Sequence, residues 1–432
     1  MKTLFKNAAV ITPDGVIDCG SVAVNGAFIE EVGTVTEQGF DRVIDCKGKL
    51  LMPAFYNIHC HAAMTLFRGI GDDLPLSRWL EEKIYPAEDR LTPSSVRVGS
   101  ELAIAEMVRG GVVSFSDMYF FCNETAEAAI NLGVKANLSR CLVSFDDEAT
   151  IKGDSRFDEA VRLADSYHGA ADGRIRVDMS VHAEYTNRKK YLKEVAEYTH
   201  SRDLGMQVHV SETESEHLAC MERHGGRTPV KFLADCGILV PSKTASATAA
   251  HCVWVTDEDI DILRDNRVTV AHNPISNLKL ASGVAPIHKM LNAGVNVGYG
   301  TDGAASNNAL SVLRELQCAA VLHKGITKKA DIIKTADFCR LAWENGAAAQ
   351  GRPDCGKIKV GNRADIVLLD LDSLNNIPMY DPYSTIAFSA DSRDVYLTMC
   401  DGNILFENGE YKTLDVEKLR FEAKHTIAHY FD

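Results

Sequence analysis

The stretch LMPAFYNIHCHAAM, residues 51–64, is an apolar run that ends in His59-Cys60-His61. In a β-strand successive side chains point to opposite faces, so His59 and His61 share one face while Cys60 points away. The stretch therefore predicts a buried strand with two imidazoles at its end. Because a His-x-His pair also occurs among packed and surface histidines, its meaning depends on the rest of the chain.

The composition is that of a soluble globular protein, with 432 residues, 46% hydrophobic and 25% charged, which is enough for one large domain and a smaller one. Acidic residues outnumber basic ones 60 to 46 without any Lys/Arg-rich run, which argues against nucleic acid or a membrane as partner. The 12 cysteines form no Cys-x-x-Cys motif and are expected to be reduced thiols. Because the sequence has neither an apolar leader nor an apolar run long enough to span a membrane, we predict a cytoplasmic protein. A homo-oligomer is possible.

Both ends of the chain have the texture of short strands. Residues 1–50 alternate apolar and polar positions, with turns at Pro13-Asp14-Gly15 and Asn25-Gly26. Similar texture returns in GKIKVGNRADIVLLDLD and VYLTMCDGNILFENGEY. We predict a small β-sandwich domain formed from residues 1–52 and 353–432, with a final helix over residues 415–429 in a packing role.

Between the ends, apolar runs alternate with helical stretches such as the one that follows Thr92-Pro93, which is typical of βα units around a parallel sheet. Eight such runs over about 300 residues favour a (β/α)₈ TIM barrel, residues 53–352. An open doubly wound sheet is less favoured, because no Gly-x-Gly-x-x-Gly turn follows the first strand. After residues 51–64, the expected strands are 112–118, 134–144, 175–183, 206–212, 244–254, 268–274 and 295–302, followed by two helices over 309–349.

The active site of such a barrel forms at the C-terminal ends of its strands. Three imidazoles and a carboxylate around an open position suit a catalytic zinc, whereas the alternative without a function is a set of core histidines with a capping aspartate. The ionisable residues at the predicted strand ends are His59, His61, His209, Glu212 and Asp302, and His251 lies within the sixth predicted strand.

Seven blocks of the sequence resemble the amidohydrolase superfamily, and within it the methylthioadenosine/S-adenosylhomocysteine deaminases. The resemblance covers nearly the whole chain. It implies a metal-dependent hydrolytic deaminase that converts adenosine-type nucleosides (5′-methylthioadenosine, S-adenosylhomocysteine, adenosine) to inosine-type products and ammonia. The blocks, in the order of the family, are MPAFYNIHCHAAMTLFRG, YPAEDRL, HVSET, AHCVWV, HNPISNLKLASGVAP, GTDGAASNN and VGNRADIVLLD.

The resemblance also implies the roles of the strand-end residues. Glu212 would be the proton shuttle and His251 would orient the reacting water. Members with two metals carry a bridging carbamylated lysine at the end of the fourth strand, where this chain has His182, so one divalent metal is expected, with zinc ahead of iron and manganese. The metal ligands would be His59, His61, His209 and Asp302.

Contacts to the substrate follow from the same resemblance. Glu88 would accept hydrogen bonds from both ribose hydroxyls, and His182 would contact the purine, unless it is only a barrel-wall histidine. His182-Ala183-Glu184 also matches half of the signature of unrelated zinc deaminases, but their Pro-Cys-x-x-Cys is absent. The other implied contacts are Trp79 lining the pocket, Ser306 near its mouth, and Arg140 and Arg156 at a carboxylate on the 5′ substituent.

Each of these contacts has an ordinary alternative. Trp79 would otherwise be a core aromatic, Ser306 a helix N-cap, and the two arginines solvated surface residues. Two other functions also stay open. One is a guanine or other aminoaza-aromatic deaminase or a triazine chlorohydrolase of the same superfamily, although Glu88 favours a ribose-bearing substrate. The other is a catalytically inactive scaffold, although no ligand-type residue is lost.

Overall fold

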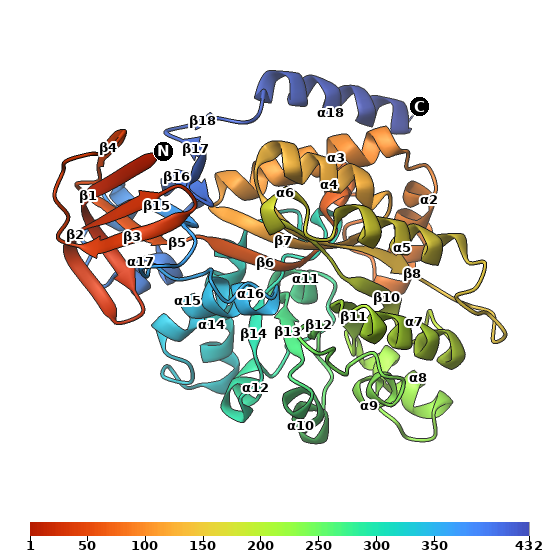
Figure 1. Ribbon diagram of the computed structural model, residues 1–432. Helices are drawn as coiled ribbons and strands as arrows, with labels where there is room; N and C mark the ends of the chain where they lie inside the picture. Colours follow the sequence, from red (N-terminus) through yellow and green to blue (C-terminus); the bar gives the residue numbers. More distant parts are fainter. Residues whose placement is uncertain (432) are drawn as a thin grey trace.

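Two sheets organise the chain, one formed by its middle and one by its two ends (Figure 1). The computed structural model describes residues 1–431. Within these residues no helix is long and apolar enough to cross a membrane.

The middle of the chain forms a ring of parallel strands, paired in the order β14-β13-β12-β11-β10-β8-β7-β6, with β9 beside β8. The backbone N–H of Asp302 donates to the C=O of His59 (3.0 Å), so the last strand of the ring meets the first. The (β/α)₈ barrel is therefore confirmed. Its strands are β6 Phe55–Cys60, β7 Val112–Tyr119, β8 Lys135–Leu142, β9 Ile175–Val177, β10 Met179–Ala183, β11 Met206–Val210, β12 Ala247–His251, β13 Thr269–His272 and β14 Val297–Tyr299.

Helices surround this ring, and their caps follow the sequence signals. The α3 helix begins after Thr92, whose side chain forms a capping box with Ser95, has Pro93 in its first turn and ends before Gly110. Further helices around the ring are α4 Cys122–Leu132, α5 Ser155–Tyr167, α6 Ala170–Gly173, α7 Lys189–Ser201, α8 Glu214–Arg223, α9 Pro229–Asp235, α10 Asp257–Asp265, α11 Pro274–Lys279, α12 Ile287–Ala293, α13 Ala304–Asn307, α14 Val312–Thr327, α15 Thr335–Ala342 and α16 Glu344–Ala349, with α3 spanning Pro93–Arg109.

The sequence predicted one strand in the stretch 51–64, and this prediction is wrong. It divides at Ala54: β5, Lys49–Pro53, belongs to the sheet of the chain ends, and β6 belongs to the barrel. Both parts are buried and apolar, so no change of periodicity marks the change of sheet. The predicted strand over 175–183 likewise divides into β9 and β10, and residues 309–349 form three helices rather than two.

The second sheet has the order β18-β17-β16-β15-β5-β1-β2-β3, with β4 beside β1. The backbone N–H of Ile29 donates to the C=O of Asn362 (2.8 Å), so the β3 edge returns to the segment that precedes β15, and the sheet folds back around its own apolar core. The β-domain from both chain ends is thus observed, while the boundaries 1–52, 53–352 and 353–432 stay predictions. Its strands are β1 Lys2–Thr12, β2 Gly15–Asn25, β3 Phe28–Gly33, β4 Arg42–Asp45, β15 Ile366–Asp370, β16 Val395–Cys400, β17 Asn403–Glu407 and β18 Glu410–Tyr411.

A buried charge cluster joins the two sheets. The ammonium of Lys135, at the start of β8, donates to Asp365 Oδ2 (2.6 Å) and to Asp401 Oδ1 (2.7 Å), and Tyr56 donates to the same Asp365. Burial alone would lower the pKa of Lys135, but the carboxylate of Asp365 raises it above its usual range.

The remaining helices are α17 Pro382–Phe388 and α18 Val416–Phe431, the latter packed on α3 (Figure 1).

Candidate active site

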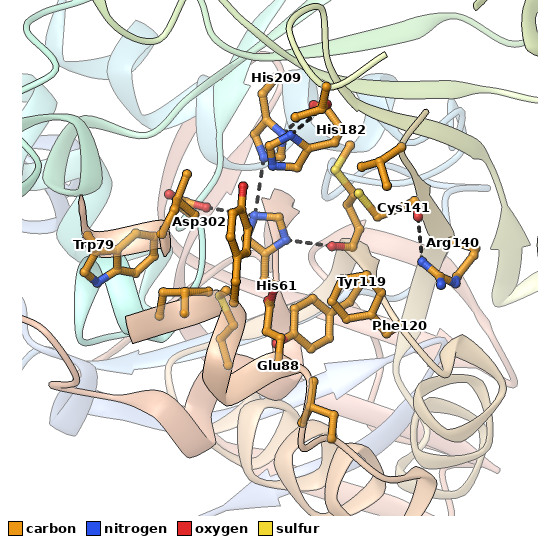
Figure 2. A pocket seen from close by; sticks show the side chains of 18 of the residues that line it. His61, Trp79, Glu88, Tyr119, Phe120, Arg140, Cys141, His182, His209 and Asp302 are labelled. Carbon is orange, nitrogen blue, oxygen red and sulfur yellow. Dashed lines mark hydrogen bonds and ion pairs between the residues drawn. The ribbon is translucent and has the colours of Figure 1, made fainter. Parts of the chain in front are cut away.

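Four ligand-type side chains from the strand ends converge on one point. His59 and His61 come from the end of β6, His209 from β11, and Asp302 from the turn after β14, and one ligand atom of each lies within 4.8 Å of the others. The Nε2 of His61 lies 3.1 Å from Asp302 Oδ1 and 3.4 Å from His209 Nε2. Figure 2 shows His61, His209 and Asp302 facing one another across this point.

Backbone carbonyls fix the orientation of two of these rings. The Nδ1 of His61 lies 2.7 Å from the C=O of Met118, and the Nδ1 of His209 lies 2.7 Å from the C=O of His182. Each ring therefore donates from Nδ1 and directs the lone pair of Nε2 into the cluster. The Nε2 of His59 is buried and has no hydrogen-bond partner within residues 1–431. Converging imidazole lone pairs and a carboxylate fit a divalent metal ion.

Asp302 is oriented by two hydroxyl groups. Its Oδ1 faces the histidines, and its Oδ2 accepts hydrogen bonds from Ser276 Oγ (2.6 Å) and Ser306 Oγ (2.8 Å). Its backbone lies in the left-handed region (φ 58°), as does that of His251 (φ 73°), and such strain is concentrated at functional sites. Ser306 is buried beneath Asp302, so its predicted place at the mouth is wrong, and the N-cap of its helix is Gly303.

Glu212 and His251 lie beside the four-residue cluster. Glu212 follows β11; its Oε1 accepts from Ser282 Oγ (3.2 Å), and its Oε2 lies 3.7 Å from His251 Nε2. The Nδ1 of His251 lies 2.8 Å from Asn277 Oδ1 and must donate to it, which leaves Nε2 as the nitrogen that faces Glu212. Burial raises the pKa of Glu212, so its protonated form persists to higher pH than that of an exposed glutamate.

The polar side chains that orient these groups were not among the residues predicted from the sequence. Ser276, Asn277 and Ser282 all lie in or just after α11, beyond the seventh strand, and are buried. Their segment, HNPISNLKLASG, stands out for small polar residues among apolar ones, which was the available signal. These side chains do not lie at a strand end, because a short helix carries them back over the site.

A cavity of about 570 Å³ opens beside the cluster, within the range of ordinary small-molecule sites. Glu212, His251 and three of the four clustered side chains contribute to its lining. Aromatic side chains supply much of the remaining wall, including Tyr119 and Phe120 (Figure 2). The predicted substrate residues that line the cavity are Trp79, Glu88, Arg140, Arg156, His182 and Glu212.

Three of these residues line the cavity from three different elements. Trp79, at the end of α1, Leu76–Trp79, is buried and donates from Nε1 to the C=O of Ile70 (3.2 Å). His182 is the last but one residue of β10, and burial lowers its pKa to about 4, so its ring is neutral. Glu88 is half-buried in α2, Tyr85–Glu88, where burial raises its pKa to about 7. Between these two helices lies the π-helical segment η2, Leu80–Ile84, and after β6 lies the 3₁₀ turn η1, Ala62–Phe67.

The two arginines line the cavity, and each already faces a carboxylate. Arg140, on β8, donates from Nε to Glu159 Oε2 (2.7 Å) and from Nη1 to the C=O of Cys141 (2.6 Å). Arg156 donates from Nε to Asp154 Oδ1 (3.1 Å). Arg156 lies in the first turn of α5, because Asp154 caps the helix before it.

Comparisons with known proteins agree with this arrangement. The chain is 43% identical over 98% of its length to a 5′-deoxyadenosine deaminase of Methanosarcina acetivorans, covering 96% of that protein. It is 41% identical to a 5-methylthioadenosine/S-adenosylhomocysteine deaminase of Dictyoglomus thermophilum, covering 98% of each chain. The structure of an adenosine deaminase from Xanthomonas campestris with bound zinc superposes with a TM-score of 0.93 at 30% identity, covering 99% of this chain and 98% of that one.

A second solved structure shows the same fold in a more distant protein. An atrazine chlorohydrolase from Arthrobacter aurescens superposes with a TM-score of 0.91 at 24% identity, covering 98% of this chain and all of that one. The family model described as the amidohydrolase family matches residues 50–405, which include the whole cluster at the strand ends. Since that match spans most of the sequence, the protein belongs to the amidohydrolase family.

Proposed function

We propose that the protein is a metal-dependent hydrolytic deaminase of adenosine-type nucleosides, which replaces the 6-amino group by oxygen and releases ammonia. The substrates we propose are 5′-methylthioadenosine, S-adenosylhomocysteine and adenosine, to which the relatives add 5′-deoxyadenosine. The observation that carries the proposal is the metal-type cluster beside Glu212 and His251, open to a cavity that also holds Glu88. The triazine and guanine alternatives offer no ribose for Glu88 to bind.

The cluster of His59, His61, His209 and Asp302 would hold one divalent metal, and zinc is the ion we propose for this donor set. When bound, such a metal supplies a water whose pKa is lowered to about 7. His182 stands at the end of the fourth strand, where a second metal would require a bridging lysine. A single metal per chain is therefore part of the proposal.

The chain's own side chains then handle the protons. Asp302 Oδ1 faces the cluster, where it can accept the proton of the attacking water, while two serine hydroxyls hold Oδ2 in place. Glu212, with its raised pKa, can deliver its proton to the ring nitrogen and regain one from the hydroxyl that has been added to the ring, while the proton taken up by Asp302 passes to the amine, which leaves as ammonia. His251 can orient the water through the Nε2 that faces Glu212.

An ammonia-release assay tests the proposal. The panel comprises adenosine, 5′-deoxyadenosine, 5′-methylthioadenosine, S-adenosylhomocysteine and guanine, with zinc, iron(II) and manganese supplied separately to metal-depleted protein. We expect ammonia from the nucleosides and none from guanine. Release from guanine alone would favour the base-deaminase alternative, and no release from any compound would favour the inactive scaffold.

The cytoplasmic location stays a prediction, with which the 12 free cysteines agree.

Glu88 predicts a pH dependence of substrate capture. Its carboxylate must be ionised to accept two ribose hydrogen bonds, and burial raises its pKa to about 7 in the free protein. The ionised fraction falls as the pH falls through 7, so kcat/KM for the nucleosides should fall on the acidic side of that value. The Glu88→Gln variant should lose this acidic limb. An unchanged limb in the variant would assign it to another group.

Arg156 predicts a difference between two substrates. A hydrogen bond to a charged group contributes about 1.5 to 3 kcal/mol, so Arg156→Met should lower kcat/KM for S-adenosylhomocysteine roughly 10- to 100-fold. Methylthioadenosine has no carboxylate and should change by only a few fold. The matched control is Arg162→Met, which removes an exposed arginine of α5 that lies outside the main cavity. Equal losses for both substrates would show that Arg156 supports the fold and does not bind the carboxylate.

A further inference from the structure

The end of the cavity formed by β8 and α5 carries both signs of charge. Arg140 reaches it from β8 and Glu159 from α5, and they are joined by the hydrogen bond from Nε to Oε2 (2.7 Å). The guanidinium of Arg140 also lies over the ring of Phe120, 4.8 Å from its centre, which fixes its plane. Figure 2 shows Arg140 on the side of the cavity opposite Trp79.

The charges at this end balance. Arg140 faces Glu159 and Arg156 faces Asp154, so two guanidinium groups meet two carboxylates. A substituent with only a carboxylate would approach Arg140 next to the like charge of Glu159. A zwitterion, or an uncharged group, would leave the balance unchanged. The charge pattern therefore matches a substituent that carries an ammonium and a carboxylate together.

Glu159 is able to take the positive group. Its side chain is 32% exposed and lines the cavity, and no hydrogen bond to its Oε1 is found within residues 1–431. A second hollow, of about 370 Å³, lies beyond the same pair, and Arg140 and Glu159 line both. Arg140 and Glu159 therefore separate the cavity from the second hollow. The space on both sides of the pair allows the side chain of Glu159 to turn towards a ligand.

We propose that Glu159 is a specificity-determining residue that accepts a hydrogen bond from the ammonium of a zwitterionic 5′ substituent, while Arg140 donates to its carboxylate. The inference rests on the proposed function, because it assigns the 5′ substituent to this end of the cavity. With Glu159 in this role, the site should prefer a 5′ substituent that is an α-amino acid over one that is only an anion. Glu159 touches the substrate away from the reacting atoms and takes no part in the chemistry.

Three nucleosides and one substitution test the inference. S-adenosylhomocysteine carries the zwitterion, its des-amino analogue keeps only the carboxylate, and methylthioadenosine is uncharged. In the wild type we expect kcat/KM for the zwitterion to exceed that for the des-amino analogue by about 10- to 100-fold. Glu159→Gln should bring this ratio close to one through a loss for the zwitterion, with methylthioadenosine changed by only a few fold. The matched control is Asp158→Asn, which removes the same charge from an exposed neighbouring position of α5 and should leave the ratio unchanged.

Two results would overturn the inference. One is an unchanged ratio in Glu159→Gln. The other is a ratio that falls only because the des-amino analogue improves, since Glu159 would then repel anions without binding an ammonium. Dissociation constants of both ligands, measured by calorimetry in a Glu212→Gln background, give the same ratio without turnover. The failure of this inference is therefore distinguishable from that of the proposed function, which would appear as wild-type protein that deaminates none of the three.

Discussion

Replacing Asp302 with alanine is expected to abolish turnover and to lower the bound metal from one equivalent per chain to well below one. The substitution removes the only carboxylate of the cluster and the group placed to accept the proton of the water. A general base alone contributes roughly 10² to 10⁴ in rate, so the combined loss should exceed about 10⁴. Elemental analysis of zinc-grown protein and the ammonia assay measure the two effects.

The control for Asp302→Ala is Asp257→Ala, which removes an exposed carboxylate of α10 that pairs with Lys289 at the surface. Thermal unfolding of both variants separates loss of the site from loss of the fold. Two equivalents of metal in the wild type would contradict the single-metal site. Measurable turnover by Asp302→Ala with its metal retained would show that another group accepts the proton.

The Glu212→Gln variant is expected to keep its metal and to lose about 10² to 10⁴ in kcat. Glu212 lies outside the four-residue cluster, and its hydrogen bond from Ser282 can be kept by the amide oxygen of glutamine. The amide can orient a substrate, but it cannot carry a proton. The loss should therefore appear in kcat more than in KM.

Single-turnover measurements check this assignment, because they report the chemical step and exclude slow product release. Ser282→Ala is the companion variant: it removes the hydroxyl that orients Glu212 but keeps the carboxylate, and should have the smaller effect. Turnover of Glu212→Gln near that of the wild type would move the proton-transfer role to another residue, such as His251, whose Nε2 lies 3.7 Å from Glu212 Oε2.

The barrel and the clustering of the four strand-end side chains were predictable because their signals are local and strong. A strand side chain alternates between faces, so His59 and His61 were placed together from their spacing alone. The rule that barrel sites form at the C-terminal strand ends added His209, Glu212, His251 and Asp302 from distant parts of the chain, and the family resemblance implied which of these are ligands. The structure brings all four within reach of one ion.

Other features depend on tertiary contacts that no local pattern in the sequence predicts. Ser306 could point to solvent or inward, and only the packing of α13 under Asp302 decides that it donates to Oδ2. Glu159 reads as an ordinary surface residue of α5, since its partner Arg140 lies on a strand 19 positions earlier. The break at Ala54 was hidden because strands of both sheets are equally apolar there.

The buried ammonium of Lys135 ties the barrel to the C-terminal strands, so the two cannot be separated without cost. A barrel cut free of its C-terminal strands would keep Lys135 but lose Asp365 and Asp401, the two carboxylates that neutralise it. Breaking a buried ion pair in this way costs about 3 to 5 kcal/mol, against a total stability of about 5 to 15 kcal/mol for a typical protein. The catalytic unit is therefore not the barrel alone but the undivided chain, and any exchange of end modules between relatives would have to carry these counter-ions with it.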